Sequence, residues 1–279
     1  MTSAPGPERA AGVRPRLVLM GEFSSGKSTL ANILLGGPFL PMQVTATRLP
    51  PVFVTYGAPS VLAVGQGGET LAMDPSDLGA LASGGFSALH VTLQAELLQL
   101  CDLVDLPGIS DPNLPEGSWD GILGAADIVL WCTHATQAWR QSEAAMWDRL
   151  RGATSGRNLL LVTQIDKLQA PRDRDRVLTR VAGETAGRFA AVHPVALLQA
   201  LHAGQDETMW RESGVQGLIE GLVEMLLAQE GAALPPASPA PSPASPGAPP
   251  ARAPVRPLRV QRPAPVSDAD IPAGRAGRV

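Results

Sequence analysis

The chain has 279 residues, 44 % of them hydrophobic, which is enough for one large domain with a buried core. Residues 231–279 hold 13 of the 27 prolines and six arginines, so this segment carries about +4 and residues 1–230 carry about −8. A nucleic-acid-binding core should be the basic part of a protein, so this distribution argues against nucleic acid as a partner.

The cysteines and the apolar runs bear on the cell compartment. Cys101 and Cys132 lie in apolar runs and lack the spacing of a zinc site, which predicts two reduced, buried side chains. No apolar run approaches the ~20 residues that span a bilayer, and the first residues lack the pattern of a signal peptide. We therefore expect a cytoplasmic protein, with a peripheral position at the inner face of the membrane as the alternative.

Predicted strands and helices alternate along the chain. Residues 1–14 predict a flexible arm, and residues 21–28 predict a loop between the first strand and the first helix. This alternation predicts an α/β fold of the three-layer P-loop NTPase type over residues 15–230, with a mostly parallel sheet and helices on both faces. The expected strands are 16–20, 52–56, 60–64, 91–100, 102–106, 128–133, 159–163 and 191–195, and the expected helices are 29–35, 138–150, 172–189 and 215–228.

The strongest motif is a phosphate-binding loop after the first strand. Residues 21–28 read GEFSSGKS and fit G-x-x-x-x-G-K-[ST] in the required strand–loop–helix context. The glycines let backbone N–H groups surround a β-phosphate, Lys27 supplies charge to the β- and γ-phosphates, and Ser28 is placed to ligate Mg²⁺. The predicted nucleotide-binding residues here are Gly21, Glu22, Phe23, Ser24, Ser25, Gly26, Lys27, Ser28 and Thr29.

A second motif, Asp105-Leu-Pro-Gly108, follows the predicted strand 102–106. A carboxylate at this place can hold Mg²⁺ through water, and the Gly108 amide can meet a γ-phosphate. The same residues also make ordinary turns, so the motif gains its meaning from the phosphate-binding loop before it. We expect Asp105 to contribute to a Mg²⁺ site with Ser28.

A third motif, Thr163-Gln-Ile-Asp166, stands where GTPases carry [NT]-K-x-D. The aspartate of that motif accepts two hydrogen bonds that guanine offers and adenine does not. Gln164 replaces the lysine, so its stem can lie along the base while the charged contact is missing. We predict that Thr163, Gln164, Asp166 and Lys167 bind guanine; a helix N-cap is the alternative role for Asp166.

A fourth element is expected where the strand 191–195 ends. In GTPases a backbone amide at this place contacts the guanine O6, a contact that requires no particular side chain. Ala196 and Leu197 are the residues predicted to make it here. A plain strand end without a nucleotide contact is an equally good interpretation.

These four elements, with the string GEFSSGKSTLANILLG, resemble the dynamin-like GTPases, above all their bacterial members, over roughly residues 16–228. The resemblance implies that Ser24 helps to hold a monovalent cation and the transition state. It implies that a switch threonine positions water and binds Mg²⁺; Thr47 is preferred over Thr45 because it leads directly into the next strand. It also implies that two G domains dimerise across the nucleotide.

Two further positions matter for catalysis. Ras-like enzymes carry a glutamine after D-x-x-G that orients the attacking water, and Ile109 stands there in this chain. The segment Trp131–Trp139 is similar to family loops near the dimer interface, so His134 lies either at the nucleotide edge or in a structural loop. Arg48 is either a charge-stabilising arginine or a solvated one.

Residues 231–279 predict a disordered tail. Their Pro-x-x-Pro spacings and arginines favour extended polyproline II, which is either a docking arm for a protein or an acidic membrane surface, or a solvated extension. Dynamin-like proteins carry a helical stalk after the G domain, and a Pro/Ala/Ser-rich segment cannot build one. We therefore expect no membrane remodelling by this chain alone.

Three functional hypotheses follow. The first is a Mg²⁺-dependent GTPase that hydrolyses GTP to GDP and phosphate and is activated by dimerisation. The second is a slow, nucleotide-gated switch that acts through a partner GTPase such as a full-length dynamin-like protein. The third, encouraged only by Gln164, is a P-loop protein that uses ATP.

Overall fold

The strands are β1 (Arg16–Gly21), β2 (Val52–Tyr56), β3 (Ser60–Gly65), β4 (Thr70–Met73), β5 (Phe86–Leu93), β6 (Asp102–Asp105), β7 (Ile128–His134), β8 (Asn158–Thr163) and β9 (Ala191–Val195). The helices are α1 (Lys27–Leu35), α2 (Asp120–Leu123), α3 (Gln141–Leu150), α4 (Pro171–Glu184), α5 (Leu197–His202), α6 (Glu207–Glu212) and α7 (Val215–Ala232). In the described residues, β2 to β6 follow one another without an α-helix between them, and strands alternate with α-helices from β6 to β9.

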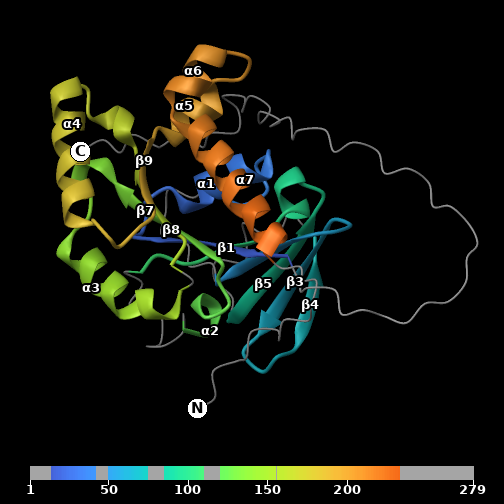
Figure 1. The fold of residues 1–279 in the computed structure, drawn as a ribbon. Coiled ribbons are helices and arrows are strands. Elements are labelled where there is room, and N and C mark those ends of the chain that lie inside the picture. Colours follow the sequence, from blue (N-terminus) through green and yellow to red (C-terminus); the bar gives the residue numbers. More distant parts are fainter. Residues whose placement is uncertain (1–13, 42–49, 75–84, 110–119, 155, 233–279) are drawn as a thin grey trace, which may run out of the picture.

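A single sheet organises these elements. The computed structural model describes residues 14–41, 50–74, 85–109, 120–154 and 156–232. In these residues the nine strands follow the order β4-β3-β5-β2-β6-β1-β7-β8-β9, with helices on both faces of the sheet (Figure 1). The predicted α/β fold is confirmed; of the predicted tail (residues 231–279), the first two residues end α7 and the rest lies outside the described residues.

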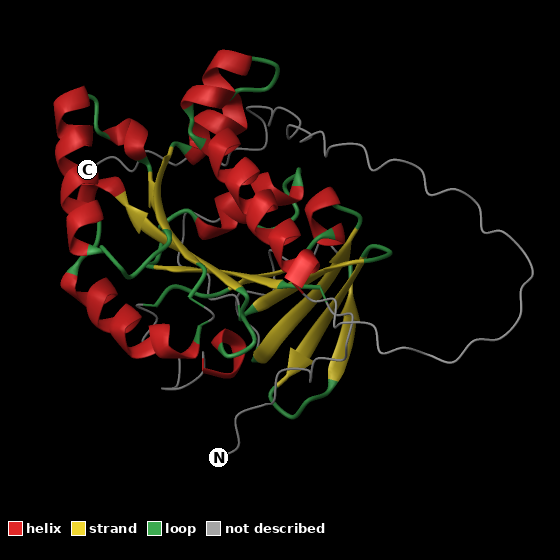
Figure 2. Ribbon diagram, in the orientation of Figure 1, coloured by secondary structure: helices red, strands yellow, loops and turns green. Residues whose placement is uncertain are grey.

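The sheet has a parallel half and a mixed half. β1 pairs in parallel with β6 and β7, β7 with β8, and β8 with β9. In the other half β2 is antiparallel to β6 and parallel to β5, and β3 is antiparallel to both β4 and β5. Parallel neighbours need long crossovers, which the helices supply, so the parallel half is the one covered by helices on both sides (Figure 2).

Alternate residues of the central strands face two separate cores. In β1, Leu17 and Leu19 pack in the core that contains α1, α5 and α7, whereas Val18 and Met20 pack in the core that contains α2, α3 and α4. All six residues of β1 are buried, as expected for a parallel strand covered on both faces. The loop that follows β1 therefore starts from a strand that is buried on both faces.

The predicted strands other than 91–100 have the predicted bounds to within one residue at each end, whereas the helices differ by more: α3 begins three residues later and α7 ends four residues later than predicted. α1 differs, because it begins at Lys27, so Lys27 and Ser28 belong to its first turn and not to the loop. α4 ends five residues before the predicted end, where the Thr185 hydroxyl donates to the Val181 carbonyl (2.7 Å) and Gly187 takes a φ of +72°. A residue in that left-handed region cannot continue a helix.

The predicted strand 91–100 is wrong. β5 covers Phe86–Leu93, and Glu96–Gln99 forms a 3₁₀ turn before β6. Leu97 and Leu98 are consecutive and both buried. A strand alternates its side chains between two faces, whereas a 3₁₀ turn can bury two neighbours in one core, so the turn fits this apolar run better.

Four short elements have no counterpart in the prediction: β4, α2, α5 and α6. The start of α6 does have a local signal, because the Asp206 carboxylate accepts from the backbone N–H of Thr208 (2.9 Å) and Met209 (3.0 Å) as an N-cap. In the described part of the chain no helix is both long and apolar enough to cross a membrane.

Gly214 and Gly36 form a matched pair for testing the turn before α7. Their φ angles are +76° and +77°, but a Cβ at Gly214 would lie 2.4 Å from the Pro194 carbonyl oxygen, whereas a Cβ at Gly36 would meet nothing within 4 Å. We expect Gly36→Ala to cost ~1 kcal/mol of unfolding free energy, which is the left-handed backbone penalty. Gly214→Ala should cost clearly more. Urea unfolding measures both, and equal losses would contradict this packing.

Candidate nucleotide-binding site

The sequence motifs meet at one edge of the sheet. β1, β6, β7, β8 and β9 are adjacent and parallel, so their carboxyl ends lie at the same edge. The phosphate-binding loop follows β1, the Asp105 motif follows β6, and the Thr163 motif follows β8. In open parallel sheets ligands bind in the crevice outside these ends. The fold therefore places all four predicted motifs at this edge, since Ala196 and Leu197 directly follow β9.

The phosphate-binding loop needs its glycines. Gly21 has a φ of +139°, and a Cβ there would lie 2.0 Å from the Cys132 carbonyl oxygen on the neighbouring strand β7. Gly26 has a φ of +90°, and a Cβ there would lie 2.9 Å from a methyl carbon of Leu197. Ser24, between them, takes a φ of +55° although it is not a glycine. Such backbone turns aim N–H groups into the hollow that an anion would occupy.

Lys27 is folded onto the loop that it follows. Its Nζ donates to the backbone carbonyls of Gly21 (3.0 Å) and Glu22 (2.7 Å), and the residue is buried. Burial lowers the pKa of Lys27, while the nearby Asp105 carboxylate opposes that change. The ammonium thus lies beneath the loop, at the place from which a phosphate-binding lysine acts.

Ser28 and Asp105 are in direct contact. The Ser28 hydroxyl donates to Asp105 Oδ2 at 2.9 Å, joining the first turn of α1 to the end of β6. Burial raises the pKa of Asp105 to about 6, although Lys27 and the Ser28 hydroxyl both act to lower it. Asp105 Oδ1 is also buried and has no hydrogen-bond partner. Ser28 and Asp105 are the two residues that the sequence motifs predict to bind Mg²⁺.

The residues after Asp105 lie against the phosphate-binding loop. A Cβ at Gly108 would lie 2.8 Å from the Phe23 backbone nitrogen, so only glycine allows this approach. The Ile109 N–H donates to the Gly21 carbonyl at 3.1 Å, and its side chain packs against the core of α2, α3 and α4. Ile109 therefore has an apolar packing role at the position where Ras-like enzymes orient water.

The Thr163 motif is hydrogen-bonded to the same loop. Thr163 is fully buried, and its Oγ1 lies 2.8 Å from the Ser25 carbonyl oxygen. Gln164 takes a φ of +55°, and its Nε2 donates to the Ser24 carbonyl at 3.1 Å. Asp166 and Lys167 are exposed in the turn that follows. The substituted residue Gln164 is thus a neutral link between the two loops, a contact that the sequence pattern did not predict.

The backbone amide predicted at Ala196 already has a partner. The Ala196 N–H donates to the Ser213 carbonyl at 2.8 Å, and Ala196 is buried. The Ala196 N–H is therefore engaged within the protein in this structure, and its contact with a base stays a prediction. Leu197 opens α5 and packs toward Gly26, so of the two predicted residues it is the one left next to the phosphate-binding loop.

Several other predicted residues have less defined places. Thr45, Thr47 and Arg48 lie outside the described residues, so the switch threonine stays a prediction. Thr29 is half-buried in the first turn of α1. His134 ends β7 directly beside Thr163, and burial together with the cations Lys167 and Arg140 lowers its pKa. His134 Nδ1 is buried without a hydrogen-bond partner.

The structure adds one contact that no motif marks. Glu22 is buried, although it lies inside the phosphate-binding loop, and its Oε1 accepts from the Ser142 hydroxyl at 3.1 Å. Ser142 is 120 positions away in the sequence, at the start of α3. No local pattern in the sequence indicates such a long-range pair, so sequence reasoning had no signal for it.

Comparisons with known proteins relate the chain to bacterial dynamin-like proteins. No protein-family model matches the chain. Dynamin-like protein 2 of Campylobacter jejuni subsp. jejuni serotype O:23/36 (strain 81-176) is 25 % identical over 214 residues, which are 73 % of this chain and 34 % of that protein. The predicted resemblance to bacterial dynamin-like proteins is confirmed.

Two solved structures share the fold. Both are described as an oligomerised bacterial dynamin pair that provides a mechanism for the long-range sensing and tethering of membranes. One matches with a TM-score of 0.60 at 18 % identity and the other with 0.56 at 19 % identity, each over 79 % of this chain and 36 % of the solved chain. The chain thus spans about a third of the length of these relatives.

The variant Asp105→Asn tests whether the ionised Asp105 carboxylate lowers the free energy of unfolding. The pKa of Asp105 in the folded protein, about 6, is above that of an unfolded aspartate, so its ionisation disfavours the folded state at neutral pH. With EDTA present at pH 7.5, we expect the amide to raise the free energy of unfolding by ~1–3 kcal/mol. The gain should shrink as the pH falls from about 6 toward 4.

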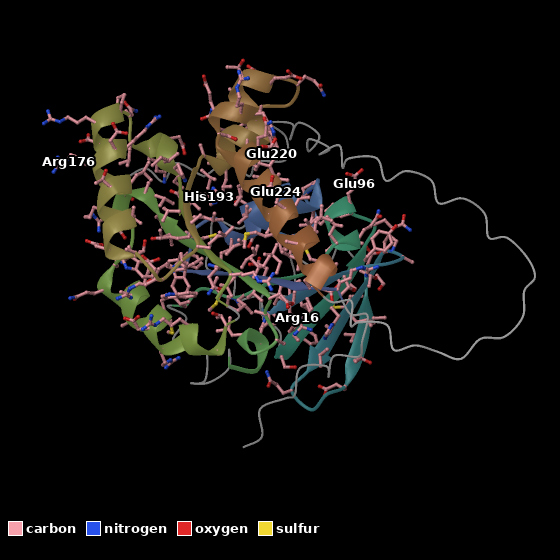
Figure 3. The ribbon with its side chains drawn as sticks, viewed as in Figure 1. Arg16, Glu96, Arg176, His193, Glu220 and Glu224 are labelled. Atoms are coloured by element: carbon pink, nitrogen blue, oxygen red, sulfur yellow. The ribbon has the colours of Figure 1, made fainter. Side chains whose placement is uncertain are left out.

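Urea unfolding at several pH values measures this change. The matched control is Glu220→Gln, which neutralises an exposed carboxylate on α7 (Figure 3) and should change stability by only a few tenths of a kcal/mol. A stability loss in Asp105→Asn at pH 7.5 would contradict this account of the buried carboxylate.

Proposed function

We propose that this chain is a Mg²⁺-dependent GTPase domain that hydrolyses GTP to GDP and phosphate. The observation that carries the proposal is the meeting of three loops. The glycine-rich loop with its positive φ angles, the Ser28–Asp105 pair and the Thr163–Asp166 turn are joined by hydrogen bonds at one edge of a parallel sheet. Its similarity to dynamin-like proteins supports the same proposal.

The phosphate half of the proposed site uses the chain's own donors and charges. The backbone N–H groups between Gly21 and Thr29 and the positive end of α1 bind the phosphates. Lys27 moves its ammonium from the loop carbonyls to the β- and γ-phosphates, a short rearrangement because Nζ already lies under the loop. These groups stabilise the charge that develops as water attacks the γ-phosphate.

The residues present fit Mg²⁺. Mg²⁺ prefers oxygen ligands and is usually held by one or two carboxylates together with substrate phosphates. Ser28 Oγ and Asp105 are such groups, and Asp105 Oδ1 is a buried oxygen that lacks a partner. Among the residues described, no three His, Cys, Asp or Glu side chains form a group able to hold a metal alone. When bound, Mg²⁺ neutralises phosphate charge, and we propose Thr47 as its third protein ligand.

The base half of the proposed site is built around Asp166. An exposed carboxylate one turn beyond β8 can accept from two N–H groups of guanine, which adenine does not present. Gln164 positions this turn against Ser24 by its neutral amide, and Thr163, Lys167 and Leu197 complete the edge. We propose guanine specificity on this basis, with ATP as the competing hypothesis.

The first test of the proposal is nucleotide binding by the wild-type chain and by Lys27→Ala. Binding of a fluorescently labelled GTP analogue in the presence of Mg²⁺ should weaken at least 100-fold in Lys27→Ala. The reason is that the loop loses its only ammonium next to the phosphates. Unlabelled GTP should displace the analogue from the wild-type protein far better than ATP does.

The control variant also removes one positive charge, but at a position away from the proposed nucleotide site. Arg176→Ala removes a cation from the exposed side of α4, where the side chain extends away from the sheet (Figure 3), and should leave the affinity unchanged. Retained affinity in Lys27→Ala would overturn the phosphate site. Equal displacement by ATP and GTP would overturn guanine specificity and favour an ATP-binding protein.

A nucleotide-gated switch is the second candidate function, and Ile109 favours it. The side chain packs into the core and offers no hydrogen bond to water, so the described residues lack the water-orienting glutamine of Ras-like enzymes. A second copy or a partner GTPase would then have to complete the site. For a chain related to proteins described as an oligomerised dynamin pair, we propose the nucleotide-dependent homodimer as that partner, with Ser24 and a monovalent cation at the contact.

Turnover measured against protein concentration separates the two functions. If two G domains complete each other's site, phosphate release per molecule should rise steeply with concentration and then level off when the dimer is saturated. A flat and very slow rate over the same range would favour the switch. Docking of the tail to a protein or to an acidic membrane is a separate proposal, so the turnover assay contains no lipid.

A further inference from the structure

Glu143, in the first turn of α3, is a buried carboxylate that the proposed chemistry does not use. Its side chain is 1 % exposed. Oε1 accepts from Trp131 Nε1 at 3.1 Å, and Oε2 accepts from Thr133 Oγ1 at 2.9 Å and from the Arg140 N–H at 3.0 Å. Burying a carboxylate is costly, so a group held by three donors in a core is constrained to one position.

The loop between β7 and α3 is strained, and this carboxylate holds both of its ends. Trp139 takes a φ of +58°, which is rare for a bulky side chain. Its N–H donates to Thr133 Oγ1 at 3.0 Å, and its ring contacts Trp131 and Phe189 edge to face. Strained backbone persists where the surroundings over-determine it and is concentrated at functional sites.

Two hydrogen-bonded routes lead from Glu143 to the phosphate-binding loop. Thr133, which donates to Glu143, offers its carbonyl oxygen 3.1 Å from Thr163 Oγ1, and the same Oγ1 lies 2.8 Å from the Ser25 carbonyl oxygen. Ser142, adjacent to Glu143 in α3, donates to the Glu22 side chain at 3.1 Å. Both routes end on carbonyl or carboxylate oxygens of the loop itself.

We propose that Glu143 is a positioning residue of the nucleotide site: it fixes Thr133 and the start of α3, and these hold the phosphate-binding loop through Thr163 and Ser142. The inference rests on the proposed function, since the loop is what would bind GTP. The consequence is that damage to a buried carboxylate in α3 weakens nucleotide binding without removing any group that touches the nucleotide.

A purely structural role would have a different signature. Glu143 also accepts from the N–H of Arg140, the residue before α3, as a helix-capping glutamate does. If capping and core packing were its whole role, its loss would lower stability and leave the affinity of the folded protein unchanged. The distinguishing readout is therefore nucleotide affinity in variants of comparable stability.

The test uses Glu143→Gln, Thr133→Val and the double variant in the full chain. Gln keeps the shape but replaces one acceptor oxygen by a donor, and Val removes the Thr133 hydroxyl. We expect each single variant to bind the labelled GTP analogue at least 10-fold more weakly than the wild-type protein does. The double variant should lose little more than one single variant, because both changes interrupt the same route.

The matched control is Thr185→Val, which deletes another buried hydroxyl. Among the described residues, Thr185 Oγ1 bonds only the Val181 carbonyl of α4, so its loss should lower the melting temperature but leave the affinity unchanged. Wild-type affinity in a folded Glu143→Gln, or fully additive losses in the double variant, would overturn the inference while the GTP site stands. A wild-type protein that does not bind GTP would instead overturn the proposed function itself.

Ser142→Ala keeps the test decisive if Glu143→Gln fails to fold. Ser142 is exposed, so the variant should fold, and it interrupts only the route to Glu22. We expect a loss of affinity of 2- to 5-fold, smaller than that of Thr133→Val because the Ser142–Glu22 bond is only partly buried, whereas Thr133 is fully buried. Unchanged affinity in both Ser142→Ala and Thr133→Val would overturn the positioning role.

Discussion

The close contact between Gly21 and the backbone of β7 is the constraint on which the rest of the site depends. Because Gly21 has no Cβ, its backbone lies where a Cβ would be 2.0 Å from the Cys132 carbonyl oxygen. The chain can therefore leave β1 in a left-handed turn, pass over Lys27 and enter α1 within a few residues. Any side chain at this position would push the loop away from β7. The hydrogen bonds that the loop makes with residues after β6 and at the end of β8 would then be disturbed as well.

The order of the strands turns this local geometry into a site. β1 lies between β6 and β7, so the loop after β1 meets Asp105 on one side and the end of β7 and β8 on the other. β2 pairs antiparallel with β6 such that Val52 stands opposite Asp105. The first residue of β2 thus lies beside the carboxylate that is predicted to bind Mg²⁺.

The sequence predicted the parts of this arrangement that are encoded locally. The glycine and lysine pattern of the loop, the buried strands and the Asp105 motif all depend on neighbours in the chain, and the fold that they predict is the observed one. Contacts between distant positions had no such signal: the Ala196 amide is taken by Ser213, and Glu22 bonds Ser142. A strand was wrongly predicted at 97–98, where the two consecutive leucines are buried in a 3₁₀ turn. A short continuous apolar run has no periodicity that distinguishes a strand from a helical turn.

The two departures from the GTPase pattern have opposite structural outcomes. Gln164 replaces a lysine, and its amide still reaches the Ser24 carbonyl, so the connection between the base turn and the phosphate loop is retained without a charge. Ile109 stands where Ras-like enzymes have a glutamine, and its partly buried side chain packs against the core of α2, α3 and α4, so this position has no hydrogen-bonding side chain. The described residues thus keep the contact at the first position and have no hydrogen-bonding side chain at the second. Under the proposed function, the group that orients water has to come from another segment or another molecule, whereas the contacts proposed to bind GTP lie largely within the described residues.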